Sequence, residues 1–475
     1  MGCSRRENGK GSSGRALTYA FLFIAGTTLA QAPVPSADGT TPLHQAVRAN
    51  DLATVQRLLK SGASPSAANR YGITPLYLAT ENANAEMVGI LLKAGAHPKA
   101  TLPGGQTLLM SAARTGNAEA LKMFLDRGAD PNTRETTNGE TALMWAASQN
   151  HPETVKALIA RGAEVNTRSM LHQYRTDRFG LEGVVTILPK GSLTPLMFAA
   201  RDGAPDAALA LTQAGADVNL ADPDGTTALL FAISNGHYDT AAVLLDAGAD
   251  PNLADTSGTA ALYAAVDMST LIEIYGRPRQ KTNDKLTALE LIAKLLDKGA
   301  RVNAQLKSAT LQRAHTPGDG RLGEGTTPLM RAARNGDAPA MRLLLARGAD
   351  PNLQQKTKVT ALILAAGLGR GLGVFNDEYS TETMQLEAVK VLLDQKVDVN
   401  AATETGQTAL HYAALTMDSV VELLAKNGAN VNAKDNQGRT PLDMANGKGG
   451  PGRAGAAAQP RPGTVALLRR LGATS

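Results

Sequence analysis

The chain has 475 residues, of which 43% are hydrophobic but only 4% aromatic, so it can bury a large core built mainly of aliphatic side chains. Its single cysteine excludes a disulfide or a multi-thiolate metal site within the chain. The net charge is +5, and residues 1–32 supply most of it with four basic residues and one acidic residue, so the charge does not indicate a nucleic-acid partner.

The first 32 residues have the layout of a secretory signal peptide. A basic opening precedes an apolar run from Ala16 to Ala30, an A-x-A sequence at 30–32 and a Pro-containing linker at 33–36. The run is short for a membrane span, which needs roughly 20 residues. We expect cleavage after Ala32 and a periplasmic or secreted bacterial protein. An uncleaved anchor is the alternative, and a faint twin-arginine pattern at Arg5 and Arg6 leaves the export route open.

Two sequence blocks alternate from residue 37 to the C-terminus. The first reads T-P-L-H-x-A-A or a close variant, as at 40–47 (TTPLHQAV), 140–147 (ETALMWAA) and 326–333 (TTPLMRAA). The second ends in L-L-x-x-G-A-D-x-N, as at 344–352. The threonine of the first block returns every 33 residues or so, or after that interval plus an insertion. Such a period indicates a repeat architecture.

One unit, residues 326–352, explains the pattern. Thr327 is suited to cap a first helix, and Pro328 fits the first helical turn. The small and apolar residues that follow recur at helical spacing, and Gly336 permits the chain to reverse into a second helix. A single helix pair cannot close a core, so each unit has to bury its apolar face against its neighbours.

This pattern resembles the ankyrin repeat, with about eleven copies from Ala37 onward. The resemblance implies an all-α repeat solenoid of helix-turn-helix units joined by β-hairpins or turns. It also implies that the hairpins and the first helices line a concave groove. The function it implies is that of a non-catalytic scaffold, which binds a protein partner through groove, hairpin tips and insertions. We expect a monomer without a nucleic-acid partner, in contact with a membrane only through an uncleaved signal.

Insertions divide the repeats into segments. Repeats 1–4 are expected at 37–166, repeats 5, 6 and the start of 7 at 194–266, the end of repeat 7 at 286–303, and repeats 8–10 with the start of 11 at 323–445. The insertions are expected at 167–193, 267–285, 304–322 and 367–384. A Gly/Pro/Ala-rich linker at 446–463 and a C-terminal capping helix at 464–475 follow. Insertions in solenoids emerge as loops, often on the binding side.

Trp145, the only tryptophan, occupies the x of T-P-L-H-x-A-A. The same column holds Gln45 and Ser111, so it is not a closed core position. In the ankyrin family this column lies on the first helix, toward the groove. Its larger side chains either anchor a partner or pack against the next hairpin, and both interpretations stay open. The candidate partner-binding residues of this column are Trp145, Phe198, Phe231, Arg331 and Tyr412.

The insertion at 167–193 contributes a second candidate cluster. It combines aromatic and arginine side chains, a mixture that is common at protein interfaces. The alternative is that this loop merely covers an exposed edge of the repeats. The cluster consists of His172, Tyr174, Arg175, Arg178 and Phe179.

Enzyme-like strings are few. The sequence GDGRLG at 318–323 matches G-x-G-x-x-G, but it lies in an insertion and not between a strand and a helix. The seven histidines are scattered, and no nucleophile elbow or isolated carboxylate pair stands out. We therefore expect no enzyme, no cofactor and no metal. The alternatives are an enzyme or small-ligand site built from the insertions, or an intracellular ankyrin regulator whose N-terminus only resembles a signal.

Overall fold

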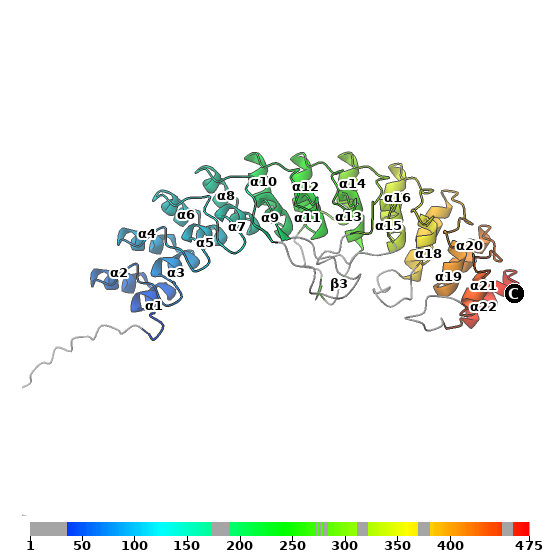
Figure 1. Ribbon diagram of the computed structural model, residues 1–475, viewed down its shortest axis with the longest axis horizontal. Coiled ribbons are helices and arrows are strands. Elements are labelled where there is room, and N and C mark those ends of the chain that lie inside the picture. Colours follow the sequence, from blue (N-terminus) through cyan, green and yellow to red (C-terminus); the bar gives the residue numbers. More distant parts are fainter. Residues whose placement is uncertain are drawn as a thin grey trace, which may run out of the picture.

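The computed structural model describes residues 36–172, 190–270, 273–274, 277–278, 284–310, 322–368, 381–448 and 459–474. Within these ranges, 22 helices form eleven consecutive pairs, which we number as repeats 1–11. The pairs stand side by side in one row that curves into an arch (Figure 1). The first helices follow its inner side and the second helices its outer side, so the predicted all-α ankyrin solenoid is confirmed.

Each pair consists of a first helix followed by a second helix. The first helices are α1 (Pro42–Arg48), α3 (Pro75–Glu81), α5 (Leu108–Thr115), α7 (Ala142–Ser148), α9 (Pro195–Asp202), α11 (Ala228–Ser234), α13 (Ala261–Ser269), α15 (Pro328–Asn335), α17 (Ala361–Ala365), α19 (Ala409–Thr416) and α21 (Pro441–Ala445). The second helices are α2 (Leu52–Lys60), α4 (Ala85–Lys93), α6 (Ala118–Leu125), α8 (Pro152–Ile159), α10 (Pro205–Gln213), α12 (Tyr238–Asp246), α14 (Ala288–Asp297), α16 (Ala338–Ala346), α18 (Glu382–Leu393), α20 (Asp418–Lys426) and α22 (Pro462–Arg470).

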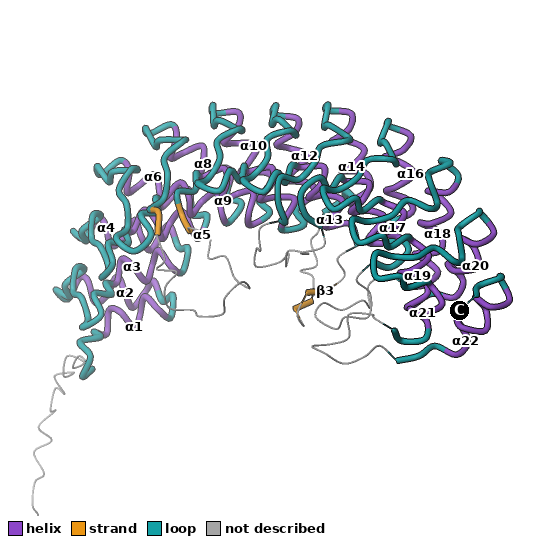
Figure 2. Tube along the Cα trace, turned by 45° about the vertical axis from the view of Figure 1, so that its right-hand side comes forward, coloured by secondary structure: helices purple, strands orange, loops and turns teal. Residues whose placement is uncertain are grey.

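Two short antiparallel ladders accompany the helices. Strands β1 (Leu171–His172) and β2 (Lys190–Gly191) pair with each other, as do β3 (Glu273–Ile274) and β4 (Arg277–Pro278) (Figure 2). None of the described helices combines the length and apolarity needed to cross a membrane. The longest of them, α18, has 12 residues.

The first helices begin and end as their sequences predict. The Thr327 hydroxyl accepts the backbone N–H of Met330 at 3.2 Å, and Pro328 occupies the first turn of α15. Gly336 ends this helix at φ +70°, a left-handed conformation that suits glycine. Ala260 stands where most other repeats have threonine, and it makes no side-chain cap. The conserved shape of each repeat therefore starts from local hydrogen bonds within the motif.

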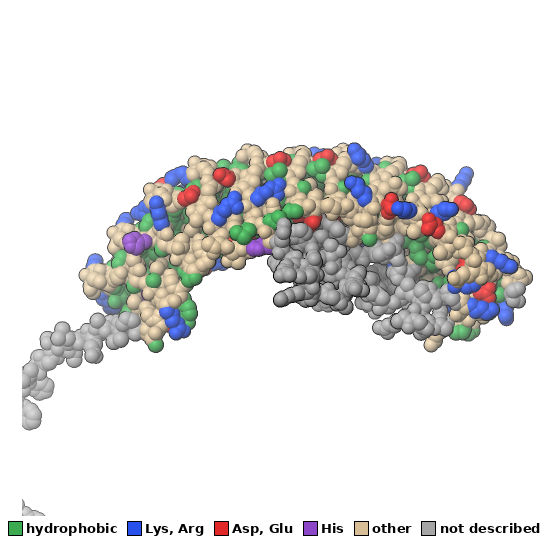
Figure 3. Space-filling model, viewed as in Figure 1, with side chains coloured by type: hydrophobic (Ala, Val, Ile, Leu, Met, Phe, Trp, Pro, Cys, Tyr) green, Lys and Arg blue, Asp and Glu red, His purple; other side chains and the backbone are tan. Residues whose placement is uncertain are grey.

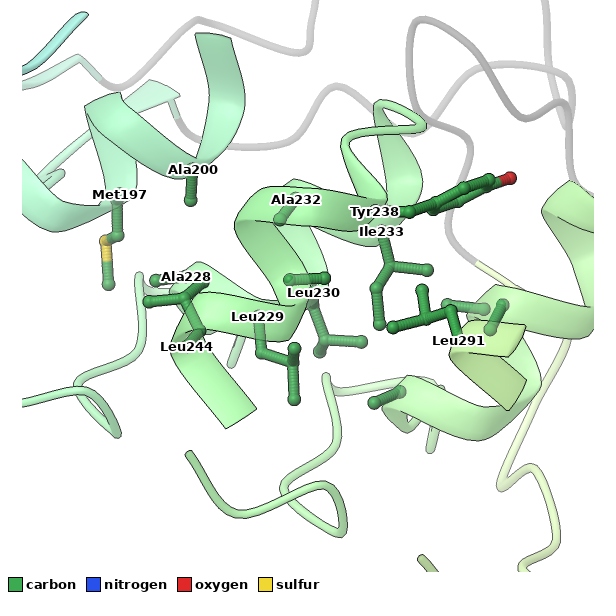
Figure 4. Packing of buried hydrophobic residues seen from close by; sticks show 14 of the residues in the cluster. Met197, Ala200, Ala228, Leu229, Leu230, Ala232, Ile233, Tyr238, Leu244 and Leu291 are labelled. Atoms are coloured by element: carbon green, nitrogen blue, oxygen red, sulfur yellow. The ribbon is translucent and has the colours of Figure 1, made fainter. Parts of the chain in front are cut away.

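The core runs continuously along the arch. Figure 4 shows Leu229, Ala232 and Ile233 of α11 between Met197 of α9 on one side and Leu291 of α14 on the other. Each first helix contacts the first helix of the next repeat, and the second helices from α4 onward pack in the same way. Fully burying one leucine contributes about 1.5–3 kcal/mol. Because each repeat buries its apolar side chains against its neighbours, it depends on them for most of its stability.

The hairpins between repeats are joined tip to tip by backbone hydrogen bonds. The N–H of Arg70 donates to the carbonyl of Asp38 at 2.9 Å, and that of Thr136 donates to Gly104 at 2.8 Å. The N–H of Thr256 donates to Asp224 at 2.9 Å in the same manner. A ribbon of hairpins thus accompanies the inner helices, in agreement with the tight turns that the Asp-Gly pairs predict.

Several predicted segment boundaries differ from the observed ones. Helix α18 begins at Glu382, inside the predicted insertion 367–384, because Thr381 caps it by accepting the N–H of Met384 at 3.2 Å. Leu306 lies inside the predicted insertion 304–322 but is buried and belongs to the hairpin of repeat 8: its N–H donates to the carbonyl of Thr326 at 2.9 Å. Helix α22 starts at Pro462, two residues before the predicted start, because proline fits its first turn.

Candidate functional site

The inner face, which we define as the side of the arch formed by the first helices, carries the predicted aromatic column. Trp145 of α7, Phe231 of α11, Arg331 of α15 and Tyr412 of α19 are all partly exposed there. Charged side chains are scattered over the outer side (Figure 3), where Arg161 pairs with Asp126 and Arg347 with Asp297 across neighbouring repeats.

Phe198 differs from the rest of its column. Its side chain is only 5% exposed, and the guanidinium carbon of Arg201 lies 4.7 Å from the centre of its ring. Leu193, which precedes the capping threonine of repeat 5, is also buried. Trp145, Phe198 and Phe231 therefore do not form one continuous exposed aromatic strip, because the middle ring packs into the protein.

Three members of the column are hydrogen-bonded to the residue five positions earlier, which directly precedes the capping threonine. We call this arrangement a hairpin–helix pair. Trp145 Nε1 donates to Glu140 Oε2 at 2.8 Å, and the Tyr412 hydroxyl donates to Gln407 Oε1 at 2.6 Å. In repeat 3, Gln106 Nε2 donates to Ser111 Oγ at 3.0 Å. The polar tips of Trp145 and Tyr412 are thus satisfied within the chain, and their ring surfaces are what a partner can contact.

Sequence reasoning overlooked these pairs. The sequence does contain an indication of them. In repeats 3, 4 and 10 the residue before the capping threonine can form a hydrogen bond, and so can the column residue five positions later. In repeats 5 and 9 both members are apolar and buried: Leu193 with Phe198, and Val359 with Leu364. Considering the column alone left the exposure of each member undecided.

Glu140 is the only carboxylate in the three polar hairpin–helix pairs. Burial raises its pKa, and the nearby carboxylates of Glu135 and Asp202 raise it further, while the Trp145 hydrogen bond and Arg201 act in the opposite direction. Arg201 is itself held by Asp202 through two contacts of 2.8 Å, from Nε and Nη2. The centre of repeats 4 and 5 is therefore a compact group of aromatic and charged side chains on the inner face.

Arg331 joins two repeats. Its Nη2 lies 2.5 Å from Asp267 Oδ1 of α13, and the two side chains are only 12% and 17% exposed. Nearby, the Ser269 hydroxyl donates to Asp337 Oδ2 at 2.6 Å. Arg331 therefore connects repeats 7 and 8 in addition to presenting a partly exposed surface.

The insertion cluster is described only at its edge. His172 belongs to β1 and pairs through its backbone with Lys190 of β2. Tyr174, Arg175, Arg178 and Phe179 lie outside the described residues. Two neighbours that the sequence analysis passed over, Met170 and Leu171, are 46% and 40% exposed.

The described histidines of the T-P-L-H motif have structural partners. His44 Nε2 lies 2.9 Å from the carbonyl of Ile73, and His411 Nε2 lies 3.1 Å from that of Arg439. Burial lowers the pKa of His411. Within the described parts of the chain, no three His, Cys, Asp or Glu side chains are grouped to hold a metal ion. Of the glycine-rich string at 318–323, only 322–323 are described.

Comparison with known proteins identifies the repeats. Profiles of ankyrin repeats match residues 17–102, 96–169, 183–275 and 379–450 (three-copy profile) and 312–365 (many-copy profile). The chain is 33% identical to the mitochondrial disaggregase of Bos taurus over 161 residues, which are 32% of this chain and 19% of that protein. It is 37% identical to the neurogenic locus Notch protein of Drosophila melanogaster over 89 residues, 18% of this chain and 3% of that protein.

A third relative, the transient receptor potential cation channel subfamily A member 1 of Homo sapiens, is 31% identical over 123 residues, 26% of this chain and 10% of that protein. The chain thus spans less than a fifth of the length of each of these relatives, and the likeness concerns the repeats rather than the whole proteins. The profiles, in contrast, cover most of the chain, from its first repeat to its last. The chain therefore belongs to the ankyrin repeat family.

Proposed function

We propose that this chain is a non-catalytic scaffold that binds a protein partner on the inner face of the arch. Ankyrin repeats typically mediate protein–protein interactions, and profiles of such repeats match most of this chain. The observation that carries the proposal is the state of Trp145 and Tyr412. Their polar tips are bonded within the chain while their rings remain partly exposed in one column of the inner face.

A site-specific cross-linking experiment tests the face. A photo-crosslinking residue replaces either Ser148, at the end of α7 on the inner side, or Lys156, on α8 on the outer side. We expect the inner probe to cross-link a protein from the native source and the outer probe to remain unreacted. Cross-linking through Lys156 alone, with none through position 148, contradicts the proposal.

We further propose that residues 1–32 form a secretory signal and that the exported protein is a monomer beginning at Pro33. The support is the order of the basic opening, the apolar run and the A-x-A sequence. Sequencing the N-terminus of the protein purified from its native source decides the matter. A start at Pro33 agrees with a cleaved signal, whereas a chain that keeps Met1 or Gly2 contradicts cleavage and favours either the uncleaved anchor or the intracellular alternative.

A further inference from the structure

The hairpin–helix pair of repeat 4 uses a charged acceptor where a neutral one suffices. In repeats 3 and 10 the residue before the capping threonine is a glutamine, Gln106 or Gln407, and its amide makes the hydrogen bond. In repeat 4 the same position is Glu140, which accepts a single N–H from Trp145. One indole donor needs one acceptor, and an amide oxygen provides it. The charge of Glu140 is therefore not required by the local structure.

Keeping a carboxylate here is unfavourable for the free protein. Burial raises the pKa of Glu140, which means that its environment disfavours the charged form. The nearest cation, Arg201, is bound to Asp202 and lies over the ring of Phe198. Among the described residues, no Lys or Arg lies within 4.0 Å of the Glu140 carboxylate. Asp202 and Glu140 both act on the guanidinium of Arg201, and Asp202 is the one that binds it, so Glu140 has no ion-pair partner among the described residues.

Apolar surface adjoins this group. Trp145 is partly exposed, and the hairpin of repeat 4 is bonded to the chain that enters the insertion, because the N–H of Met170 donates to the carbonyl of Asn138 at 2.6 Å. Met170 and Leu171 are two of the exposed large apolar side chains of the described residues. A partner at this position meets a carboxylate, an aromatic ring and two exposed aliphatic side chains.

We propose that repeat 4 binds a lysine or arginine side chain of the protein partner, with Glu140 as its counter-ion, the Trp145 ring as its platform, and Met170 and Leu171 in contact with an adjacent apolar residue of the partner. A cation over a tryptophan ring is attracted to the ring face, and this attraction grows as water is excluded. The incoming cation also balances the charge of Glu140. An acidic segment is repelled by the same group. This inference rests on the proposed function and names the chemistry of the partner.

The repeats themselves suggest the decisive variant. Glu140→Gln keeps an oxygen acceptor for Trp145 Nε1, as Gln407 does for Tyr412, and removes only the charge. The matched control is Glu153→Gln, which makes the same change in the same repeat, on the exposed outer face of α8. Thermal unfolding of both variants establishes that they fold. We expect Glu140→Gln to be at least as stable as the original chain, because a partly buried charge is lost.

The probe is a phage-displayed library of random linear peptides, selected on the chain from residue 33 onward. We expect the selected peptides to be rich in Lys or Arg next to an apolar residue. We also expect Glu140→Gln to weaken their binding about tenfold or more, whereas Glu153→Gln leaves it unchanged. Trp145 is the only tryptophan, so its fluorescence should change when such a peptide binds.

The possible results separate this inference from the proposed function. Peptides that cross-link to position 148 but lack basic residues, or that bind Glu140→Gln as tightly as the original chain, overturn the inference and leave the scaffold function standing. Selection of no peptide, or of peptides that cross-link only to position 156, overturns both. Basic peptides that leave the Trp145 fluorescence unchanged place the cation elsewhere and also overturn the inference.

Discussion

The second helices of repeats 1–3 begin differently from those of repeats 5, 6 and 10. Helices α2, α4 and α6 each follow a residue that caps its own helix by accepting a backbone N–H: Asp51, Asn84 and Asn117. Helices α10, α12 and α20 follow residues that make no side-chain cap: Ala204, His237 and Met417. In the second group a neighbouring repeat provides the acceptor.

Three side chains act across repeat boundaries in this way. Asn150 of repeat 4 accepts the N–H of Ala207 in α10 at 2.9 Å. Asp284 of repeat 7 accepts those of Tyr238 and Asp239 in α12, at 3.1 and 3.3 Å. Glu382 of repeat 9 accepts that of Ser419 in α20 at 2.9 Å.

The exchange between repeats 6 and 7 is mutual. Asp239 of α12 accepts the N–H groups of Lys285 and Leu286, both at 3.0 Å. Each side of this boundary therefore satisfies backbone donors on the other side. The comparison teaches that the second helices of repeats 1–3 are capped by their own preceding residues, whereas those of repeats 5, 6 and 10 depend on a neighbouring repeat for an acceptor. Damage at a shared cap should consequently spread over two repeats.

The largest effect is expected where α12 meets repeat 5. Gly203 has φ +72°, and a Cβ there would lie 2.4 Å from the His237 ring. Gly203→Ala should lower the free energy of unfolding by about 3 kcal/mol, from backbone strain and the clash together. The control is Gly62→Ala in repeat 1, with φ +84° and open space around the Cβ, which should cost about 1 kcal/mol. Denaturant titration compares them, and equal losses contradict a role for the His237 contact.

The next effect concerns the shared cap itself. Asp284→Ala removes the acceptor of two backbone donors of α12 and should cost about 2 kcal/mol, whereas Asn117→Ala, which removes a self-contained cap, should cost about 1 kcal/mol. Hydrogen exchange locates the damage. We expect faster exchange on both sides of the repeat 6–7 boundary after the first change and only in α6 after the second. If hydrogen exchange in Asp284→Ala becomes faster only in α12, the cap is not shared.

A substitution in repeat 1 can introduce a contact between repeats that repeats 6 and 7 already have, and should thereby raise stability. The Asn252 side chain donates to the Gly299 carbonyl at 3.0 Å and accepts the N–H of Arg301 at 2.8 Å, which joins repeats 6 and 7. The equivalent residue of repeat 1 is Ser66, whose hydroxyl lies 3.5 Å from the Gly95 carbonyl. Ser66→Asn should therefore stabilise repeats 1 and 2 by about 1 kcal/mol, measured by thermal unfolding. An unchanged or lower midpoint contradicts this expectation.

The smallest effect is a pH dependence in the last repeats. Burial lowers the pKa of His411, so the folded state disfavours its charged form. In the unfolded chain His411 takes up a proton as the pH falls below its ordinary pKa of 6.5, and in the folded chain it does so only at lower pH. Stability should thus be complete above 6.5 and decline below it. His411→Met should reduce this decline, measured by hydrogen exchange of α19–α21 at two pH values, and an unaltered decline assigns it to other groups.

Methionine is the appropriate replacement because the chain already uses it at this position. The sulfur atoms of Met110 and Met197 accept the N–H groups of Thr107 and Thr194, each at 3.4 Å. His411 Nδ1 accepts that of Thr408 at 3.1 Å. The variant therefore retains a cap acceptor but loses, together with the titrating ring, the contact of His411 Nε2 with the Arg439 carbonyl.

The helix pairs could be predicted from the sequence because their signals are local. A threonine, a proline one residue later, apolar residues at helical spacing and a terminal glycine lie within a few residues of one another, as in 327–336. The edges of the insertions were less predictable. Thr381 caps α18 without the usual motif around it, and Leu306 belongs to a hairpin that closes only when it meets Thr326.

The candidate site could be predicted in position but not in exposure. The motif located Trp145, Phe198 and Tyr412 in one column of the first helices. Whether each side chain is exposed to solvent depends on the residue before the capping threonine and on side chains such as Arg201 that cover the ring. The exposed pair Met170 and Leu171 has no such motif, and its accessibility follows from where the chain leaves the stack.

The sequence by itself determined the repeat period, the helix pairs and the order of stacking, because capping and hydrophobic periodicity act within one unit of about 33 residues. Only the tertiary structure decided which members of the inner column remain exposed and which helices take their caps from a neighbour. Those features depend on contacts between residues that are far apart in the chain, such as Asp284 and Tyr238. Such contacts exist only after the repeats have packed, because no local hydrogen bond brings their atoms together.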